Sequence, residues 1–201
     1  MDLKPSQACN VTFVGAVGSG KTTLAQGLVL PLKLRDLDAV FVSEPVRIFL
    51  RRSGPYSHYL EDFPIFLETV KQEEEMQEHE FLVYDSASFI SAAYMQFYRP
   101  EKLSAAEEQK WEYCYRLLYG LTRDRAKRFE QIFYVPSGKF PLQEDPNRKW
   151  KPQEAEQLDK IIKAFLDANG FEYHEVESVD LGERLEEVQQ VLTDKKLIPR
   201  S

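Results

Sequence analysis

Short runs of β-branched and aromatic residues alternate along the chain with longer segments whose apolar residues recur every three or four positions. The short runs predict five strands, and each is bounded by glycine, proline or charged residues. These strands cover residues 11–14, 38–43, 81–84, 131–135 and 171–176.

The longer segments between these strands predict helices. The clearest covers residues 154–169, where five apolar side chains recur at helical spacing and Gly170 follows as a stop. Ser104 and Glu107 match a capping box at the start of a helical region that runs to residue 129. Pro31 is expected to end a helix over residues 24–30, and Pro45 to begin another. Further helical patterns cover residues 59–79, 86–98 and 181–192.

Alternating strands and helices favour parallel pairing through right-handed crossovers. We therefore predict an α/β fold, a doubly wound, mostly parallel sheet of five strands with helices on both faces. No repeat or flexible linker divides the chain, so we expect one domain over residues 1–195 and a tail over 196–201. Residues 136–152 hold four prolines and many charges and are predicted to form a lid, a solvated surface loop being the alternative.

Composition narrows the class of protein. The 201 residues are 43% hydrophobic and carry a net charge of −7, the wrong sign for a sequence-independent grip on nucleic acid. Cys9 and Cys114 lie far apart and form neither a disulfide framework nor a zinc motif. The chain has no apolar run long enough to span a bilayer and no secretory signal. We expect a cytoplasmic protein, and the sequence makes no prediction of its oligomeric state.

One segment carries a specific chemical signature. Residues 15–22 fit the pattern G-x-x-x-x-G-K-[ST] after a predicted strand and before a predicted helix, the context of a P-loop. Such a loop turns its N–H groups toward phosphates, while its lysine reaches the outer phosphates and its hydroxyl binds Mg²⁺. We therefore predict binding of ATP and Mg²⁺, with Lys21 on the phosphates and Thr22 on the metal. The predicted nucleotide-binding residues are Gly15, Ala16, Val17, Gly18, Ser19, Gly20, Lys21, Thr22 and Thr23.

Two carboxylates follow predicted strands and are candidates for the chemistry. Asp85 is expected to hold Mg²⁺ or to accept a proton from an attacking hydroxyl, although capping the next helix is an alternative role. Glu44 follows the second strand and is the other candidate for the base. A surface pair of Glu44 with Arg47 is the alternative for that residue.

The remaining charged and aromatic residues are less specific. One arginine of the cluster Arg123, Arg125 and Arg128, or Arg148 of the predicted lid, is a candidate to close on the triphosphate. The acidic residues between Glu73 and Glu80 are interpreted as a solvated helix face. The three histidines lack metal-ligand spacing. Aromatic residues that could stack on a base, although such residues more often belong to the core, are Phe49, Tyr56, Tyr59, Phe63 and Phe89.

Taken in order, these motifs resemble a family of P-loop kinases, the ribosylnicotinamide kinase-like AAA domains of NadR proteins. The matching elements are the P-loop, Glu44 with Arg47, the pair Asp62-Phe63, and Asp85-Ser86. The predicted lid matches in having a proline, acidic residues and an arginine, namely Pro141, Glu144, Asp145 and Arg148. One position departs from the pattern, because Ala87 stands where the family often has a second aspartate.

The resemblance implies transfer of a phosphoryl group from ATP to a nucleoside-like small molecule, with nicotinamide riboside as the leading acceptor. It implies catalytic roles for Lys21, Asp85, Glu44 and Arg148. Glu44-Pro45-Val46 also looks like deoxynucleoside kinases, in which this glutamate is the base. A regulatory ATPase that acts on a protein partner is a further alternative.

Overall fold

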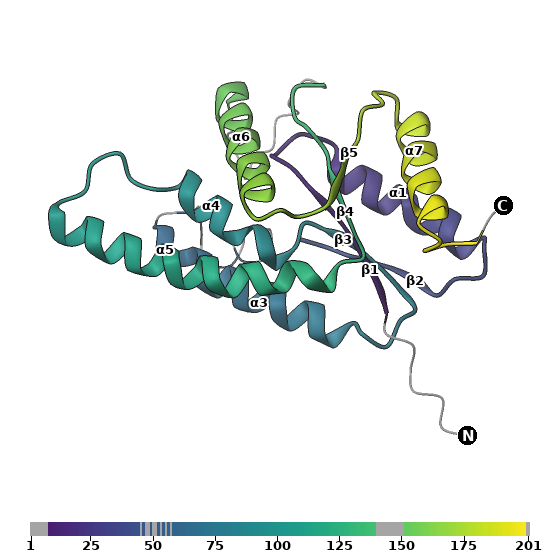
Figure 1. Ribbon diagram of the computed structural model, residues 1–201, viewed down its shortest axis with the longest axis horizontal. Coiled ribbons are helices and arrows are strands. Elements are labelled where there is room, and N and C mark those ends of the chain that lie inside the picture. The colour runs from purple at the N-terminus through teal and green to yellow at the C-terminus, as the bar shows by residue number, and fades with distance from the viewer. Residues whose placement is uncertain are drawn as a thin grey trace.

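A computed structural model describes residues 8–44, 46, 49, 52, 54, 56, 58–139 and 151–199. Its centre is a five-stranded sheet in the order β2-β3-β1-β4-β5, in which every pair of neighbours is parallel (Figure 1). The predicted fold class is confirmed. The strands are β1 (Cys9–Val14), β2 (Ala39–Val42), β3 (Phe81–Asp85), β4 (Gln131–Tyr134) and β5 (Tyr173–Glu175).

Helices cover both faces of the sheet. On one face, α1 (Lys21–Lys33) and α7 (Leu181–Asp194) pack against Val11 and Phe13 of β1. On the other, α4 (Ser91–Phe97) and α6 (Pro152–Ala168) pack against Val14 and Ile132 (Figure 1). Adjacent strand residues point to opposite faces, so the central strands are apolar on both sides.

The remaining helices stand beside α4. The helices α3 (Asp62–Glu75) and α5 (Ala105–Arg125) share with it a cluster around Phe66, Met95 and Leu118. The capping box predicted at Ser104 and Glu107 is confirmed. Three short 3₁₀ turns complete the described elements: η1 (Tyr59–Glu61), η2 (Ser88–Ile90) and η3 (Ala126–Arg128). None of the helices described is both long and apolar enough to cross a membrane.

The predicted end of the first helix is wrong. Pro31 lies inside α1 instead of ending it. Its fixed φ suits a helix, and its missing N–H costs only one hydrogen bond close to the helix end. Continuing the helix buries Leu32 completely in the core, which offsets that loss. At the other end of the chain, Ile198 is buried against the same core as α1 and α7.

A buried ion pair joins α3, α5 and the loop that follows β3. Glu73 is 2% exposed, accepts hydrogen bonds from the Ser88 backbone N–H at 2.8 Å and its hydroxyl at 2.9 Å, and pairs with Arg125 at 2.5 Å. Arg125 also contacts Glu74, which pairs with Arg128. The interpretation of the acidic run as a solvated face is therefore wrong for Glu73.

We predict that Glu73→Ala lowers the free energy of unfolding by about 3 kcal/mol, because it leaves buried donors of Arg125 and Ser88 without their acceptor. Urea unfolding followed by circular dichroism measures the change. The matched control is Glu75→Ala on the same helix, which removes an exposed pair with Lys71 and should cost less than about 0.5 kcal/mol. Equal losses in the two variants would show that the buried network contributes nothing special.

Candidate active site

The P-loop connects β1 to α1 at the carboxyl edge of the sheet, where the strand ends of a doubly wound fold receive ligands. Gly18 and Gly20 have φ angles of 80° and 85°, which favour glycine. Gly15 is required for a second reason. A Cβ at this position would lie 2.2 Å from the carbonyl oxygen of Val135, so no side chain fits where the loop crosses the end of β4.

The N-terminus of α1 presents an uncompensated positive end. Its N-cap is Gly20, no side chain of the described residues caps it, and its first turn holds no acidic residue. By contrast, α7 is capped by Asp180, whose carboxylate accepts from the backbone N–H groups of Gly182 and Glu183. The first N–H groups of α1 and the helix dipole are thus directed at the mouth of the P-loop, an arrangement suited to phosphate.

Lys21 lies folded against the loop that precedes it. The residue is only 5% exposed, and its Nζ donates to the carbonyl oxygen of Ala16 at 3.4 Å. Ser19 is buried as well, whereas Gly18 and Thr23 are exposed. A bound phosphate would offer the ammonium group a stronger acceptor than this long contact to a carbonyl.

Thr22 and Asp85 meet at the end of β3. The Thr22 hydroxyl donates to Oδ2 of Asp85 at 2.6 Å, and Asp85 is 2% exposed. The alternative role of Asp85 as a helix cap is wrong, because Ala87 is the N-cap of η2. A hydroxyl and a carboxylate oxygen side by side are the hard donors that Mg²⁺ prefers. No group of three or more acidic, histidine or cysteine side chains forms a further metal site in the part of the chain that the structure describes.

Glu44 leaves the neighbouring strand at the same edge. Val42 of β2 pairs with Tyr84 of β3, so Asp85 is one residue and Glu44 two residues beyond the last paired positions. Glu44 is buried, at 7% exposure. Asp85 and Glu44 thus follow adjacent strands at this edge, with Asp85 in contact with Thr22 of the P-loop and Glu44 one strand further along. Arg47, the proposed surface partner of Glu44, lies outside the described residues.

Two of the predicted arginines pair with carboxylates of α3. Arg125 and Arg128 are engaged with Glu73 and Glu74, so the expectation that this cluster serves the triphosphate does not hold for these two residues. Arg148 and the other predicted lid residues lie in 140–150, outside the described part of the chain.

Two buried charged residues that the sequence reasoning missed contact the P-loop. Asp159 of α6 accepts a hydrogen bond from the backbone N–H of Ala16 at 2.8 Å. Arg184 of α7 donates to the carbonyl oxygen of Ser19 at 3.1 Å. Each interrupts the apolar face of its helix, and this interruption is the signal in the sequence that could have revealed them.

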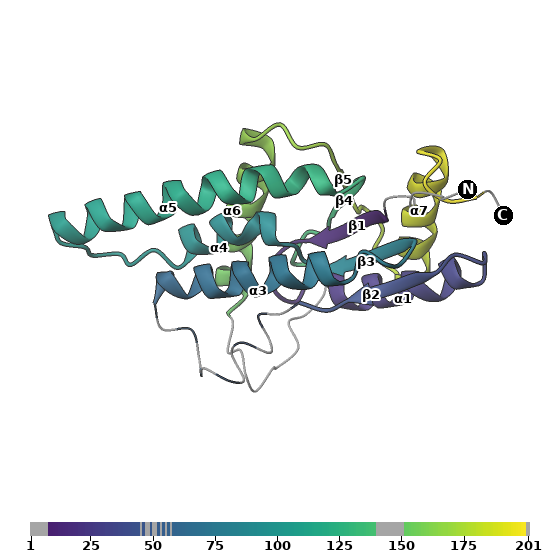
Figure 2. The same ribbon diagram turned by 90° about the horizontal axis from the view of Figure 1, so that it is seen from below.

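Another buried carboxylate, Asp62, is the first residue of α3. This helix reaches beyond the carboxyl edge of the sheet (Figure 2). The Tyr56 hydroxyl donates to Asp62, and the Tyr56 ring stacks on Tyr98 with centroids 3.8 Å apart. Burial raises the pKa of Asp62 to about 8, the hydrogen bond from Tyr56 lowers it in part, and Glu61 adds to the rise. The other aromatic candidates Tyr59 and Phe89 belong to the core.

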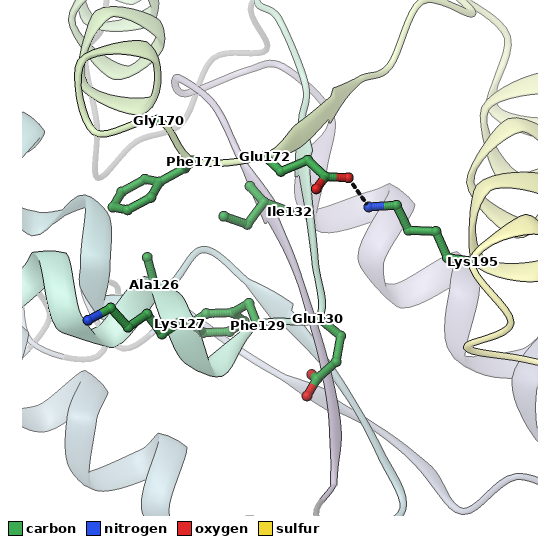
Figure 3. A pocket seen from close by; sticks show the side chains of 9 residues that line it. All are labelled: Ala126, Lys127, Phe129, Glu130, Ile132, Gly170, Phe171, Glu172 and Lys195. Carbon is green, nitrogen blue, oxygen red and sulfur yellow. Dashed lines mark hydrogen bonds and ion pairs between the residues drawn. The ribbon is translucent and has the colours of Figure 1, made fainter.

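A cavity of about 230 Å³ lies at the opposite edge of the sheet, where β4 and β5 begin. Phe129 and Phe171 form apolar walls, and Figure 3 shows the charged side chains at its rim. Lys195 pairs with Glu172 at 2.5 Å, and Glu130 accepts from the backbone N–H of Asn10 at 2.6 Å. Because these charges are already satisfied and the P-loop lies at the other edge, the cavity is separate from the candidate active site.

A sequence profile of the AAA domain family matches residues 10–184, which include the P-loop, both strand-end carboxylates and Asp159. The chain belongs to the AAA domain family. A search of curated protein sequences finds no match to this AAA domain.

Solved structures with a similar fold include two kinases. Deoxyadenosine kinase from M. mycoides with bound dATP is 16% identical, with a TM-score of 0.66 over 92% of this chain and 99% of that chain. Thymidylate kinase from Ehrlichia chaffeensis is 15% identical, with a TM-score of 0.64 over 94% of this chain and 99% of that chain. At this identity the similarity concerns the fold, that of the P-loop NTPases.

We predict that Asp62 makes stability depend on pH. The native protein holds the Asp62 proton up to about pH 8, whereas the unfolded chain releases it near the ordinary pKa of 3.8. The native state therefore binds the extra proton between these values, and the free energy of unfolding falls as pH rises, by on the order of 1 kcal/mol per pH unit.

Urea unfolding of wild type and Asp62→Asn from pH 5 to pH 8 measures this dependence, because Asn keeps an acceptor for Tyr56 and does not titrate. The stability of Asp62→Asn relative to wild type should rise with pH. The exposed control Asp194→Asn should show no such trend. A constant difference between Asp62→Asn and wild type would contradict the assignment.

Proposed function

We propose that the protein is an ATP-dependent phosphotransferase that moves the γ-phosphoryl group of ATP to a hydroxyl of a nucleoside-like small molecule. The observation that carries the proposal is the pairing of Thr22 with Asp85 beside a second buried carboxylate, Glu44. Asp85 would serve the metal and Glu44 the acceptor, and transfer to a hydroxyl requires both roles.

The P-loop and α1 would bind the triphosphate. The N–H groups of the loop and of the first helical turn face the phosphate oxygens, and Lys21 leaves the Ala16 carbonyl to contact the β- and γ-phosphates. Thr22 and Asp85 would hold Mg²⁺, Thr22 directly and Asp85 directly or through water. The metal would neutralise charge on the phosphates when bound.

Glu44 is then the general base. Asp85 accepts a hydrogen bond from the Thr22 hydroxyl and would therefore bind the metal together with it. Glu44 follows the neighbouring strand β2 and would remain available to the acceptor. In the transfer step the acceptor hydroxyl attacks the γ-phosphorus and its proton passes to Glu44. The bond from the γ-phosphorus to the β–γ bridging oxygen breaks, and ADP leaves.

Two observations bear on the acceptor. The order of motifs resembles ribosylnicotinamide kinase-like domains and favours nicotinamide riboside. The solved structures of similar fold are named deoxyadenosine kinase and thymidylate kinase, which favours a deoxynucleoside or a nucleoside monophosphate. Nicotinamide riboside and a deoxynucleoside would both be phosphorylated on a sugar hydroxyl, whereas a nucleoside monophosphate would accept the phosphoryl group on its phosphate. We propose transfer to a sugar hydroxyl, with nicotinamide riboside first in the series to be tested.

We predict that Lys21→Ala weakens binding of ATP·Mg²⁺ at least tenfold, because it removes the point charge that contacts the β- and γ-phosphates. Isothermal titration calorimetry gives the affinity. Lys33→Ala at the far end of α1 is the control and should bind as wild type does. Unchanged affinity in Lys21→Ala would contradict the assignment of the P-loop.

We predict that Glu44→Gln lowers the turnover number 10²- to 10⁴-fold at saturating ATP with little change in ATP affinity, as loss of a positioned base does. Asp85→Asn should instead raise the Mg²⁺ concentration needed for half-maximal rate, since it removes a ligand charge from the metal. Steady-state kinetics with a magnesium titration separates the two roles. Full turnover in both variants would overturn the layout.

The function itself is tested with a panel of acceptors. ADP formation is measured with ATP alone and with nicotinamide riboside, ribonucleosides, deoxynucleosides and nucleoside monophosphates. At least one acceptor should raise the rate well above that of hydrolysis. If none does and a protein partner instead stimulates phosphate release, the protein is a regulatory ATPase.

A further inference from the structure

Asp159 connects two loops that leave the carboxyl edge of the sheet. One carboxylate oxygen accepts from the backbone N–H of Ala16 in the P-loop at 2.8 Å, and the other accepts from the backbone N–H of Ser137, just beyond β4. Asp159 is 7% exposed, so these hydrogen bonds form away from water.

Arg184 holds the same loop from the opposite face of the sheet. It is 2% exposed and donates through Nε to the carbonyl oxygen of Ser178 at 2.8 Å and through Nη1 to that of Ser19 at 3.1 Å. Ser178 is in turn held by Glu187, whose carboxylate accepts from its backbone N–H at 3.0 Å. The P-loop is thus fixed near both of its ends, at Ala16 by α6 and at Ser19 by α7.

The charge of Asp159 opposes the ligand of the proposed function. A buried carboxylate beside a phosphate site repels the triphosphate and is costly to desolvate. Electrostatics alone would therefore favour a neutral residue here. Its two oxygens nevertheless satisfy two main-chain donors at once, one on each oxygen. Asn in the same place would present an oxygen to one of these donors and an NH₂ group to the other.

We propose that Asp159 and Arg184 are positioning residues that hold the P-loop in its phosphate-binding shape before ATP arrives. This inference rests on the proposed binding of ATP. A loop fixed in advance spends less of the binding energy on ordering its backbone. Neither residue touches the phosphates; each acts through the backbone of Ala16 or Ser19.

Two conservative variants separate positioning from charge. Asp159→Asn removes the negative charge and leaves one N–H donor without an acceptor. If charge dominates, this variant binds ATP·Mg²⁺ more tightly than wild type. If positioning dominates, it binds about tenfold more weakly. Arg184→Lys keeps the positive charge but cannot reach both carbonyls with a planar fork, and it should also weaken binding severalfold.

Calorimetry with ATP·Mg²⁺ and with inorganic triphosphate measures these affinities, at a temperature where thermal unfolding shows every variant to be folded. Asp167→Asn is the matched control: it lies on the same helix, accepts from the Tyr173 hydroxyl at 2.7 Å, and should change neither ligand's affinity. A purely structural role lowers the melting temperature of Asp159→Asn without changing its affinity. That result, or tighter binding, overturns the proposal.

Hydrogen exchange without nucleotide keeps this inference distinct from the proposed function. Asp159→Asn should speed exchange at least tenfold at the backbone N–H of Ala16 or of Ser137, and unchanged exchange at both overturns the proposal whatever the ligand. The wild-type protein could fail to bind ATP while Asp159→Asn still speeds exchange in the P-loop. That combination refutes the proposed function and leaves Asp159 as the residue that holds the loop.

Discussion

The parallel register between β1 and β3 is the constraint on which the site depends. Phe13 pairs with Asp85, and the N–H of Ser86 donates to the Phe13 carbonyl oxygen at 2.9 Å, so β3 ends where the P-loop begins. A slip of one residue would move Asp85 by about 3.3 Å and turn it to the other face, away from Thr22. In the observed register, Val11 and Phe13 of β1 pack with Phe81 and Val83 of β3 in one core cluster, which a slip of one residue would disrupt.

Buried charges stabilise the loops that surround this edge. Glu73 holds the loop after β3, Asp159 joins the P-loop to the exit of β4, and Arg184 joins the P-loop to the exit of β5. Each forms hydrogen bonds with main-chain groups that have no partner within a strand or a helix. Loops that carry chemistry in other proteins are often mobile; here the charged side chains fix the backbone around the phosphate site in the described structure.

Much of this architecture could be predicted from the sequence because local signals agree with the tertiary packing. The apolar runs locate all five strands, and the spacing of Leu158 and Ile162 locates α6. The helix end predicted at Pro31 is wrong because burial of Leu32 stabilises the helix by more than one lost hydrogen bond costs. Asp159 and Arg184 were missed because their partners lie 143 and 165 residues away, a distance that no local pattern encodes. The interpretation of the acidic run as solvated failed at Glu73 for the same reason, since its partner Arg125 lies on another helix.

The fate of the γ-phosphoryl group tests the central claim most directly. Phosphorus NMR of a reaction with ATP, Mg²⁺ and a nucleoside acceptor distinguishes a phosphate monoester of the acceptor from free inorganic phosphate. The proposed roles of Asp85 on the metal and of Glu44 as the base predict that the monoester dominates and that Glu44→Gln slows its formation 10²- to 10⁴-fold. Inorganic phosphate as the sole product, formed at the same rate with and without acceptor, would contradict the account.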